Sequence, residues 1–150
     1  MKFYSPSDPD YSLWLSIRRA HEAIYEIRKK EIRPYKLSTI ETGVLLVVHG
    51  AKNNITPAEI SRQLLKPSNL VSQLLTRMEK KGLLHKTRGS PKRNMVQIEL
   101  TKKGEEAFKL STSGKKLNKI MSVLSDREKS QLVKYLDKLR QRAMEDMLWM

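Results

Sequence analysis

The 150-residue chain has no cysteine. This excludes a disulfide scaffold, a thiolate zinc site, a cysteine nucleophile and a sensor that works by thiol oxidation. Long apolar runs are missing too, because the longest aliphatic stretch, Val44–Val48, is far shorter than the roughly 20 residues that span a membrane. The first residues form no apolar signal-peptide core. These absences predict a cytoplasmic protein with no membrane partner.

Motifs of catalysis are missing as well. The sequence has no Walker-type phosphate loop, no dinucleotide-binding glycine pattern and no metalloprotease pair of histidines. The three histidines, His21, His49 and His85, fall in three different predicted elements without a shared spacing. We therefore expect no enzyme, no catalytic residues, no metal site and no cofactor.

Acidic residues are scarce, since 16 Asp and Glu stand against 30 Lys and Arg, for a formal net charge of +14. The excess is concentrated in residues 62–93, which hold nine basic residues and a single acidic one, Glu79. A solvated basic surface would have this charge, and so would a surface that binds a polyanion such as nucleic acid. The pattern of residues within the segment favours the second interpretation.

Start and stop signals predict a series of helices. Apolar residues spaced three and four apart outline a first helix over residues 13–33, which ends because a proline follows. A capping box at residues 38–41 opens an apolar helix that ends at Gly50. A second capping box at residues 56–59 opens a short helix, and Pro67 starts the next helix almost at once.

The helix Pro67–Lys81 is predicted to have two different faces. Its apolar residues fall on one side of a helical projection and are expected in the core: Leu70, Val71, Leu74, Leu75 and Met78. The opposite side carries small polar and basic residues, which is typical of a surface that contacts base edges and phosphates. From this helix we predict DNA contacts by Ser68, Asn69, Ser72, Gln73, Thr76, Arg77 and Lys80.

Two β-like stretches follow, Leu83–Arg88 and Met95–Leu100, joined by a turn with cationic residues near its tip. In the second stretch we expect Val96, Ile98 and Leu100 to point inward. A two-stranded ribbon with a basic tip is a wing. From the wing we predict DNA contacts by Arg88, Lys92, Arg93 and Asn94.

The C-terminal third is predicted to be helical. Apolar residues spaced three and four apart predict one long helix from Thr101 to Leu124, and Ser125–Glu128 caps a successor. The first and last helices both carry long apolar stripes, which favours a homodimer, although an intrachain core is the alternative. The predicted interface residues are Leu13, Trp14, Ile17, Leu132, Leu136, Leu139, Met147 and Trp149.

The predicted fold class is mainly α with a small β-hairpin wing (α+β). A winged helix-turn-helix core over residues 38–104 is flanked by an N-terminal arm and dimerisation helix over 1–37 and by C-terminal dimerisation helices over 105–150.

This order of elements, with the stretches Ile55–Ser61, Asn69–Leu83 and Val96–Gly104, resembles the MarR family of transcriptional regulators over nearly the whole chain. The resemblance implies a homodimeric repressor whose terminal helices interlock. It also implies that two recognition helices enter successive major grooves of double-stranded DNA at a pseudo-palindromic operator, while the wings enter the flanking minor grooves.

Two departures from the family pattern concern specificity. Gln73 stands where the family commonly has Arg, and Lys92 and Asn94 stand where its wing usually has Asp and Arg. We expect Arg93 to take over insertion into the minor groove. Gln73 would read adenine, whereas Arg would favour guanine, so an operator rich in A·T is expected.

The resemblance further implies a small-molecule effector site between the helical arms and the winged domain. The candidate residues are His21, Tyr25, Arg28 and Tyr35. The alternative is that these side chains only pack. A different function also stays open, since winged helices serve as architectural, RNA-binding or protein-interaction modules that have no specific operator.

Overall fold

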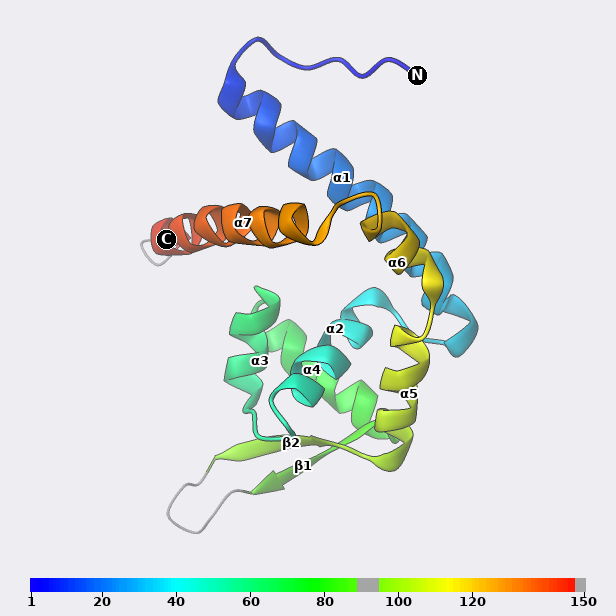
Figure 1. The fold of residues 1–150 in the computed structure, drawn as a ribbon. Coiled ribbons are helices and arrows are strands. Elements are labelled where there is room, and N and C mark those ends of the chain that lie inside the picture. Colours follow the sequence, from blue (N-terminus) through cyan, green and yellow to red (C-terminus); the bar gives the residue numbers. More distant parts are fainter. Residues whose placement is uncertain (89–94, 148–150) are drawn as a thin grey trace. The chain divides into compact units, whose positions relative to one another are not determined.

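The computed structural model describes residues 1–88 and 95–147. The chain forms two compact units, Met1–Gly114 and Lys115–Met150. Figure 1 labels the α-helices and strands of the first unit, which are α1 (Pro9–Ile32), α2 (Thr39–Gly50), α3 (Pro57–Leu64), α4 (Ser68–Lys80), β1 (Leu84–Arg88), β2 (Val96–Leu100) and α5 (Lys102–Thr112). A 3₁₀ turn, η1 (Arg33–Tyr35), follows α1. The second unit contains α6 (Lys115–Met121) and α7 (Asp126–Met147).

The helix starts follow the local sequence signals. Both predicted capping boxes are present, with Ser38 at the start of α2 and Thr56 at the start of α3. The first helix begins earlier than predicted, because the Asp8 side chain accepts hydrogen bonds from two free backbone N–H groups of the first turn and Pro9 fits the first helical position. It ends at Ile32, where the 3₁₀ turn η1 accommodates Pro34.

A single hydrophobic core lies between α2, α3, α4 and the hairpin. Its members are apolar residues at helical or alternating spacing, and the fully buried ones include Val44, Leu45, Val48, Ile60, Val71, Leu74, Leu75, Met78, Leu84 and Ile98. Burying this many aliphatic side chains supplies the main free energy that holds the helix-turn-helix together, at about 25 cal/mol per Å² of apolar surface.

The hairpin is antiparallel, with Leu84 opposite Leu100 and Arg88 opposite Val96. The Ile98 N–H also donates a 2.9 Å hydrogen bond to the Ile55 carbonyl, which fixes the hairpin to the segment before α3. The prediction that Val96 points into the core was wrong, since its side chain is 38% exposed. Val96 lies at the end of the paired region farthest from the core, beyond the residues that α2 and α3 cover.

The predicted continuous helix from Thr101 to Leu124 was also wrong, because α5 ends at Thr112 and α6 begins at Lys115. Glycine at position 114 has poor helix propensity, and the Ser113 hydroxyl donates to the Leu110 carbonyl, which competes with helical hydrogen bonding. A Cβ at position 114 would lie 1.9 Å from a carboxylate oxygen of Glu31, so a larger residue there would require the Glu31 side chain to move.

In the second unit, α7 begins as predicted, with the Ser125 hydroxyl accepting a hydrogen bond from the Glu128 N–H. Its described residues include no buried side chain. Leu132, Leu136 and Leu139 are spaced four and three apart, so they share one face of the helix. The helix therefore has an apolar stripe along an otherwise charged surface.

Candidate nucleic-acid interface

The helix α4 is the second helix of the helix-turn-helix, and the core fixes which of its faces is exposed. Val71, Leu74, Leu75 and Met78 are buried, as the projection predicted. All seven DNA-contacting residues predicted on this helix are exposed: Ser68, Asn69, Ser72, Gln73, Thr76, Arg77 and Lys80. Glu79, the one acidic residue of α4, lies beside these residues and accepts a hydrogen bond from the Lys86 N–H. With this single acidic residue among polar and basic ones, α4 has the composition of a recognition helix that enters the major groove.

The prediction that Leu70 lies in the core was wrong. Its side chain is 41% exposed and lines a shallow hollow on the polar face with Ser72, Gln73, Thr76 and Arg77. Leu70 is at the edge of the apolar sector, next to Asn69, where the core no longer covers the helix. An apolar side chain here is suited to contact the methyl group of thymine.

The turn that precedes α4 is fixed by the backbone. Leu65 closes α3 in a left-handed conformation with φ 52°, and the Ser61 hydroxyl donates to the Lys66 carbonyl. Ser61 is buried although it is polar, and this hydrogen bond satisfies it. These contacts set the angle at which α4 leaves α3.

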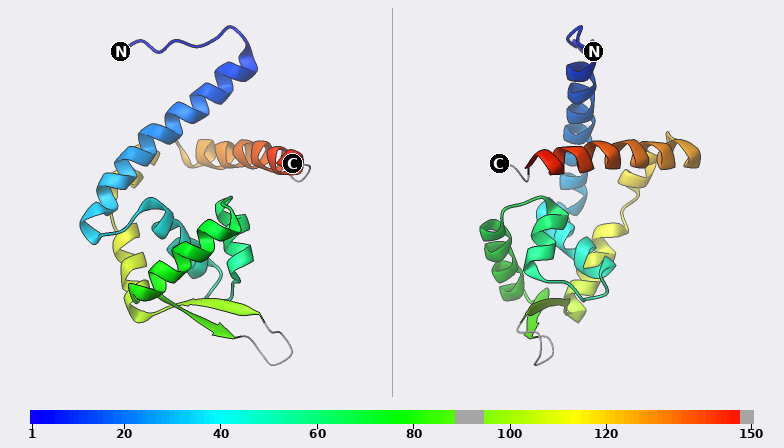
Figure 2. Two further views of the ribbon diagram at one scale, coloured as in Figure 1. Left: turned by 180° about the vertical axis from the view of Figure 1, so that it is seen from behind. Right: turned by 90° about the vertical axis from the view of Figure 1, so that its left-hand side faces the viewer.

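The strand β1 extends the polar surface of α4. Lys86 donates from its amine to the Thr76 hydroxyl at 3.4 Å, and its backbone N–H donates to the Glu79 carboxylate at 3.1 Å. Figure 2 shows the end of α4 beside the base of the hairpin. Lys86 and Arg88 are two residues apart on β1 and both are exposed, so they share one face of the strand. The two side chains therefore form a basic edge next to the recognition face.

The sequence analysis did not include Lys86 among the predicted DNA contacts, although the sequence contains a pattern that indicates it. A basic residue two positions from Arg88 on the same strand points to the same side. Of the predicted wing residues, the structure describes Arg88, at the exposed end of β1. Lys92, Arg93 and Asn94 lie outside the described residues.

The C-terminal end of α4 is held by an ion pair. The Lys81 amine, just after the helix, lies 2.7 Å from a carboxylate oxygen of Glu41 in the first turn of α2. Burial raises the pKa of Glu41, but hydrogen bonds from Lys81 and from the Ser38 backbone and hydroxyl outweigh it, so the pKa lies below its ordinary value of 4.5. Glu41 is thus ionised at neutral pH and ties α4 to α2.

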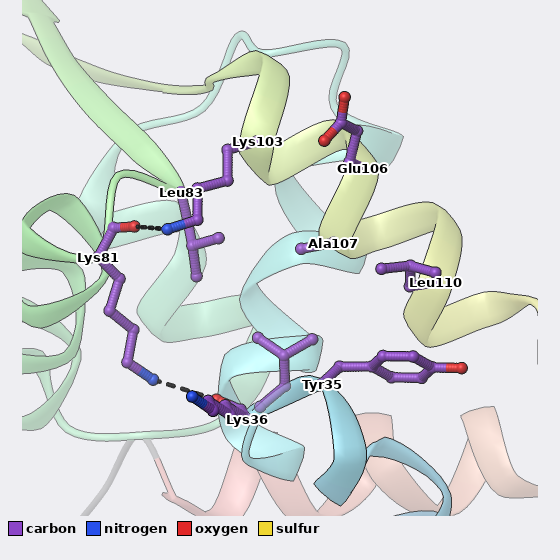
Figure 3. A pocket seen from close by; sticks show the side chains of 9 residues that line it. Tyr35, Lys36, Lys81, Leu83, Lys103, Glu106, Ala107 and Leu110 are labelled. Atoms are coloured by element: carbon purple, nitrogen blue, oxygen red, sulfur yellow. Dashed lines mark hydrogen bonds between the residues drawn. The ribbon is translucent and has the colours of Figure 1, made fainter.

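The four residues proposed for an effector site have different surroundings in the described part of the chain. Tyr35 borders a cavity of about 440 Å³ (Figure 3) with Lys36, Leu37, Lys81, Leu83, Lys103, Glu106, Ala107 and Leu110. The residues of α1 have other contacts: the His21 and Tyr25 ring centres are 5.7 Å apart, the Thr39 hydroxyl donates to the Tyr25 hydroxyl at 2.7 Å, and Arg28 pairs with Glu31 at 3.2 Å.

The residues proposed for a dimer interface are exposed on their own helices. On α1 these are Leu13, Trp14 and Ile17, and on α7 they are Leu132, Leu136, Leu139 and Met147. Trp149 lies outside the described residues. Over residues 1–88 and 95–147, no cluster of acidic and histidine side chains could hold a metal ion. In the same part of the chain, no helix is long and apolar enough to cross a membrane.

Residues 35–93, which contain the helix-turn-helix and β1, match the sequence model of the MarR family. This stretch of the chain is therefore a winged helix-turn-helix domain of the MarR family of transcriptional regulators. The MarR family is a family of DNA-binding regulators and is not enzymatic, which confirms the prediction that this chain is not an enzyme. The mainly helical fold with a two-stranded hairpin and long terminal helices is confirmed as the MarR fold.

Solved structures of MarR-type regulators are similar over most of the chain. The organohalide-sensing regulator RdhR-CbdbA1625, bound to 2,4-dichlorophenol, is 27% identical with a TM-score of 0.75, covering 95% of this chain and 88% of that one. A mutant of MarR from E. coli complexed with operator DNA is 20% identical with a TM-score of 0.73, covering 85% and 92%. MepR of S. aureus in a DNA complex is 18% identical with a TM-score of 0.77, covering 91% and 99%. No curated protein matches the chain significantly.

Proposed function

We propose that this MarR-family protein is a homodimeric, ligand-responsive repressor that binds a pseudo-palindromic operator in double-stranded DNA and acts in the cytoplasm. The observation that carries the proposal is the exposed polar and basic face of α4, with Lys86 and Arg88 on the adjacent strand. In this arrangement the basic side chains bind phosphates and release counterions, while Asn69, Gln73 and Thr76 contact base edges.

Dimerisation gives the recognition helices their spacing. We propose that residues 1–37 and 105–150 form the dimerisation arms and that residues 38–104 form the DNA-binding domain. The exposed apolar stripes of α1 and α7 support this division. Two-fold symmetry would place the two copies of α4 about one helical turn of DNA (~10 bp) apart, with Arg93 in each flanking minor groove.

The known complexes of similar proteins support two partners. MarR of E. coli and MepR of S. aureus were solved with DNA, and RdhR-CbdbA1625 was solved with 2,4-dichlorophenol. We propose that this chain likewise binds DNA and a small molecule. A ligand would regulate binding only if it favours one separation of the recognition helices over another.

The experiment that tests the function is selection of genomic and random duplex fragments by the purified chain at two salt concentrations, followed by sequencing. We expect enrichment of a two-fold symmetric site whose half-sites lie one turn apart, with binding that weakens steeply as salt rises. Salt-sensitive binding without a symmetric site would contradict the proposal and indicate an architectural or RNA-directed role. Absence of binding would indicate a protein-interaction module.

A further inference from the structure

Leu70 places an apolar side chain on the polar face of α4. It is 41% exposed, whereas the other apolar residues that the helical projection grouped with it are buried: Val71, Leu74, Leu75 and Met78. Among the described residues, Leu70 belongs neither to the hydrophobic core nor to the partly buried side chains that pack against it. The fold therefore leaves most of this side chain available for contact with a partner.

The position of Leu70 on α4 indicates which partner it contacts. Leu70 lines the shallow hollow of this helix together with Ser72, Gln73, Thr76 and Arg77. Leu70, Gln73 and Arg77 are spaced three and four residues apart, so they form one row along the helix. Leu70 is at the N-terminal end of this row, and the N-terminal residues of a recognition helix are the ones that contact base edges.

The hairpin engages the other side of the polar face. The Thr76 hydroxyl donates to the Ser72 carbonyl at 3.1 Å and accepts a hydrogen bond from the Lys86 amine at 3.4 Å. Because successive residues of an α-helix turn by about 100°, Leu70 and Thr76 lie on opposite sides of Gln73. Leu70 therefore extends the face on the side that is away from Lys86.

The major groove offers one apolar group to such a side chain, the C5-methyl group of thymine. Leu70 precedes Gln73 by three residues, which corresponds to about 4.5 Å along the helix axis. Base pairs are stacked about 3.4 Å apart. When Gln73 contacts the adenine of one base pair, Leu70 is therefore at the distance of the neighbouring base pair.

We propose that Leu70 determines specificity by contacting the C5-methyl group of a thymine on the base pair next to the one that Gln73 contacts. The inference rests on the function proposed above and adds a second specified base to each half-site. Contact removes the leucine and the methyl group from water together, and cytosine has no methyl group to offer.

Replacement of thymine by deoxyuridine tests the contact, because uracil lacks the methyl group and keeps the hydrogen-bonding groups of thymine. The DNA is the highest-ranked selected fragment, with uracil introduced at one thymine at a time, and fluorescence anisotropy measures the affinity of the full chain. We expect uracil next to the position that Gln73 specifies to weaken binding about fourfold, the effect of one buried methyl group. A scan that finds no such thymine would overturn the proposal.

A double-mutant cycle assigns the methyl contact to Leu70. Leu70→Ala shortens the exposed side chain, and Leu46→Ala makes the same change at a leucine of α2 that is 47% exposed and does not line the hollow. The measured quantity is the ratio of affinities for thymine and uracil DNA, so that changes in overall affinity cancel. Circular dichroism confirms that both variants fold.

We expect the ratio to fall to about 1 in Leu70→Ala and to stay at about 4 in Leu46→Ala. An unchanged ratio in Leu70→Ala would show that another residue contacts the methyl group, and equal losses in both variants would show that the effect is not local. Either result would overturn the proposal.

The proposed function and this inference fail in different ways. A chain that enriches no symmetric site contradicts the proposed function, and the role of Leu70 falls with it. A chain that selects a symmetric site but binds thymine and uracil DNA equally keeps the proposed function and overturns the role of Leu70 alone.

Discussion

The Lys81 amine donates a 2.7 Å hydrogen bond to the Glu41 carboxylate, and this contact joins the end of α4 to the start of α2. Glu41 serves two roles, since its other carboxylate oxygen accepts a hydrogen bond from the Ser38 N–H and completes the capping box. The orientation of the recognition helix therefore depends on one ionised carboxylate.

Replacing Glu41 separates these roles. Glutamine can still close the capping box but loses the charge, so we expect Glu41→Gln to lower the free energy of unfolding at pH 7 by about 1 kcal/mol. The expected loss in the free energy of unfolding is small because the Lys81 side chain is 45% exposed and water screens the ion pair. Glu41→Ala, which loses both roles, should cost more. Urea denaturation measures both variants, and no loss in Glu41→Gln would contradict the role of the charge.

The same pair predicts a pH dependence. The pKa of Glu41 is lowered in the folded state, so its contribution is complete above the ordinary value of 4.5 and is lost as the pH falls through the lower, folded value. We expect the difference in stability between the unmodified chain and Glu41→Gln to shrink as the pH is lowered below 4.5. A difference that stays constant over that range would show that the ion pair is not its source.

Gln73 is predicted to specify a base rather than to supply affinity. Its side chain is exposed in the middle of the polar face of α4. Removing a bidentate contact to adenine typically costs about 1–3 kcal/mol of discrimination, so Gln73→Ala should relax the preference at one base position in each half-site. Selection and sequencing measure the change. Gln63→Ala, an exposed glutamine on α3, is the control, and an unchanged base preference in Gln73→Ala would refute the assignment.

Lys86 is predicted to bind phosphate. Its amine carries a positive charge and lies beside Thr76 on α4. Lys86→Ala should therefore weaken binding to all sequences alike and lower the slope of log affinity against log salt by about 1. Anisotropy titrations at several salt concentrations measure the slope. Lys109→Ala on α5 removes an exposed charge outside this surface and should leave the slope unchanged. Equal slopes for both variants would exclude Lys86 from the interface.

Gly104 is predicted to be irreplaceable for steric reasons. A Cβ at this position would lie 1.9 Å from the Leu83 carbonyl oxygen, which is backbone and cannot rotate away. We expect Gly104→Ala to destabilise the fold by about 2–3 kcal/mol, as overpacking does. Gly50, which has nothing within 4 Å of the same atom, provides the control, since Gly50→Ala should be neutral or stabilising. Thermal unfolding compares the two, and equal melting temperatures would disprove the steric argument.

The apolar stripe of α7 is predicted to be a dimer contact. Leu136 is 40% exposed at its centre, so Leu136→Lys should raise the dimer dissociation constant at least about tenfold. Gln141 is exposed and lies nine residues beyond Leu132, which places it on the opposite side of the helix. Gln141→Lys should therefore leave the dimer intact. Sedimentation equilibrium measures both, and a monomeric unmodified chain would contradict the proposal.

The sequence by itself determined the elements whose signals are local. Capping boxes require only side chains three residues apart, so the starts of α2 and α3 were predictable, and the 3.6-residue period separated the buried and exposed faces of α4. The same locality made the exposure of the seven candidate DNA-contacting residues on α4 predictable. The absence of cysteine and of catalytic motifs, together with the basic segment, was enough to favour a nucleic-acid-binding protein.

The tertiary structure alone decided features that depend on distant residues. Gly114, between α5 and α6, lies close to the Glu31 side chain. The exposure of Leu70 and Val96 depends on where the core ends. The contact between Lys86 and Thr76, and the pairing of Lys81 with Glu41, join residues 10 and 40 positions apart. Periodicity describes each element alone, whereas these contacts arise only when the elements pack against one another.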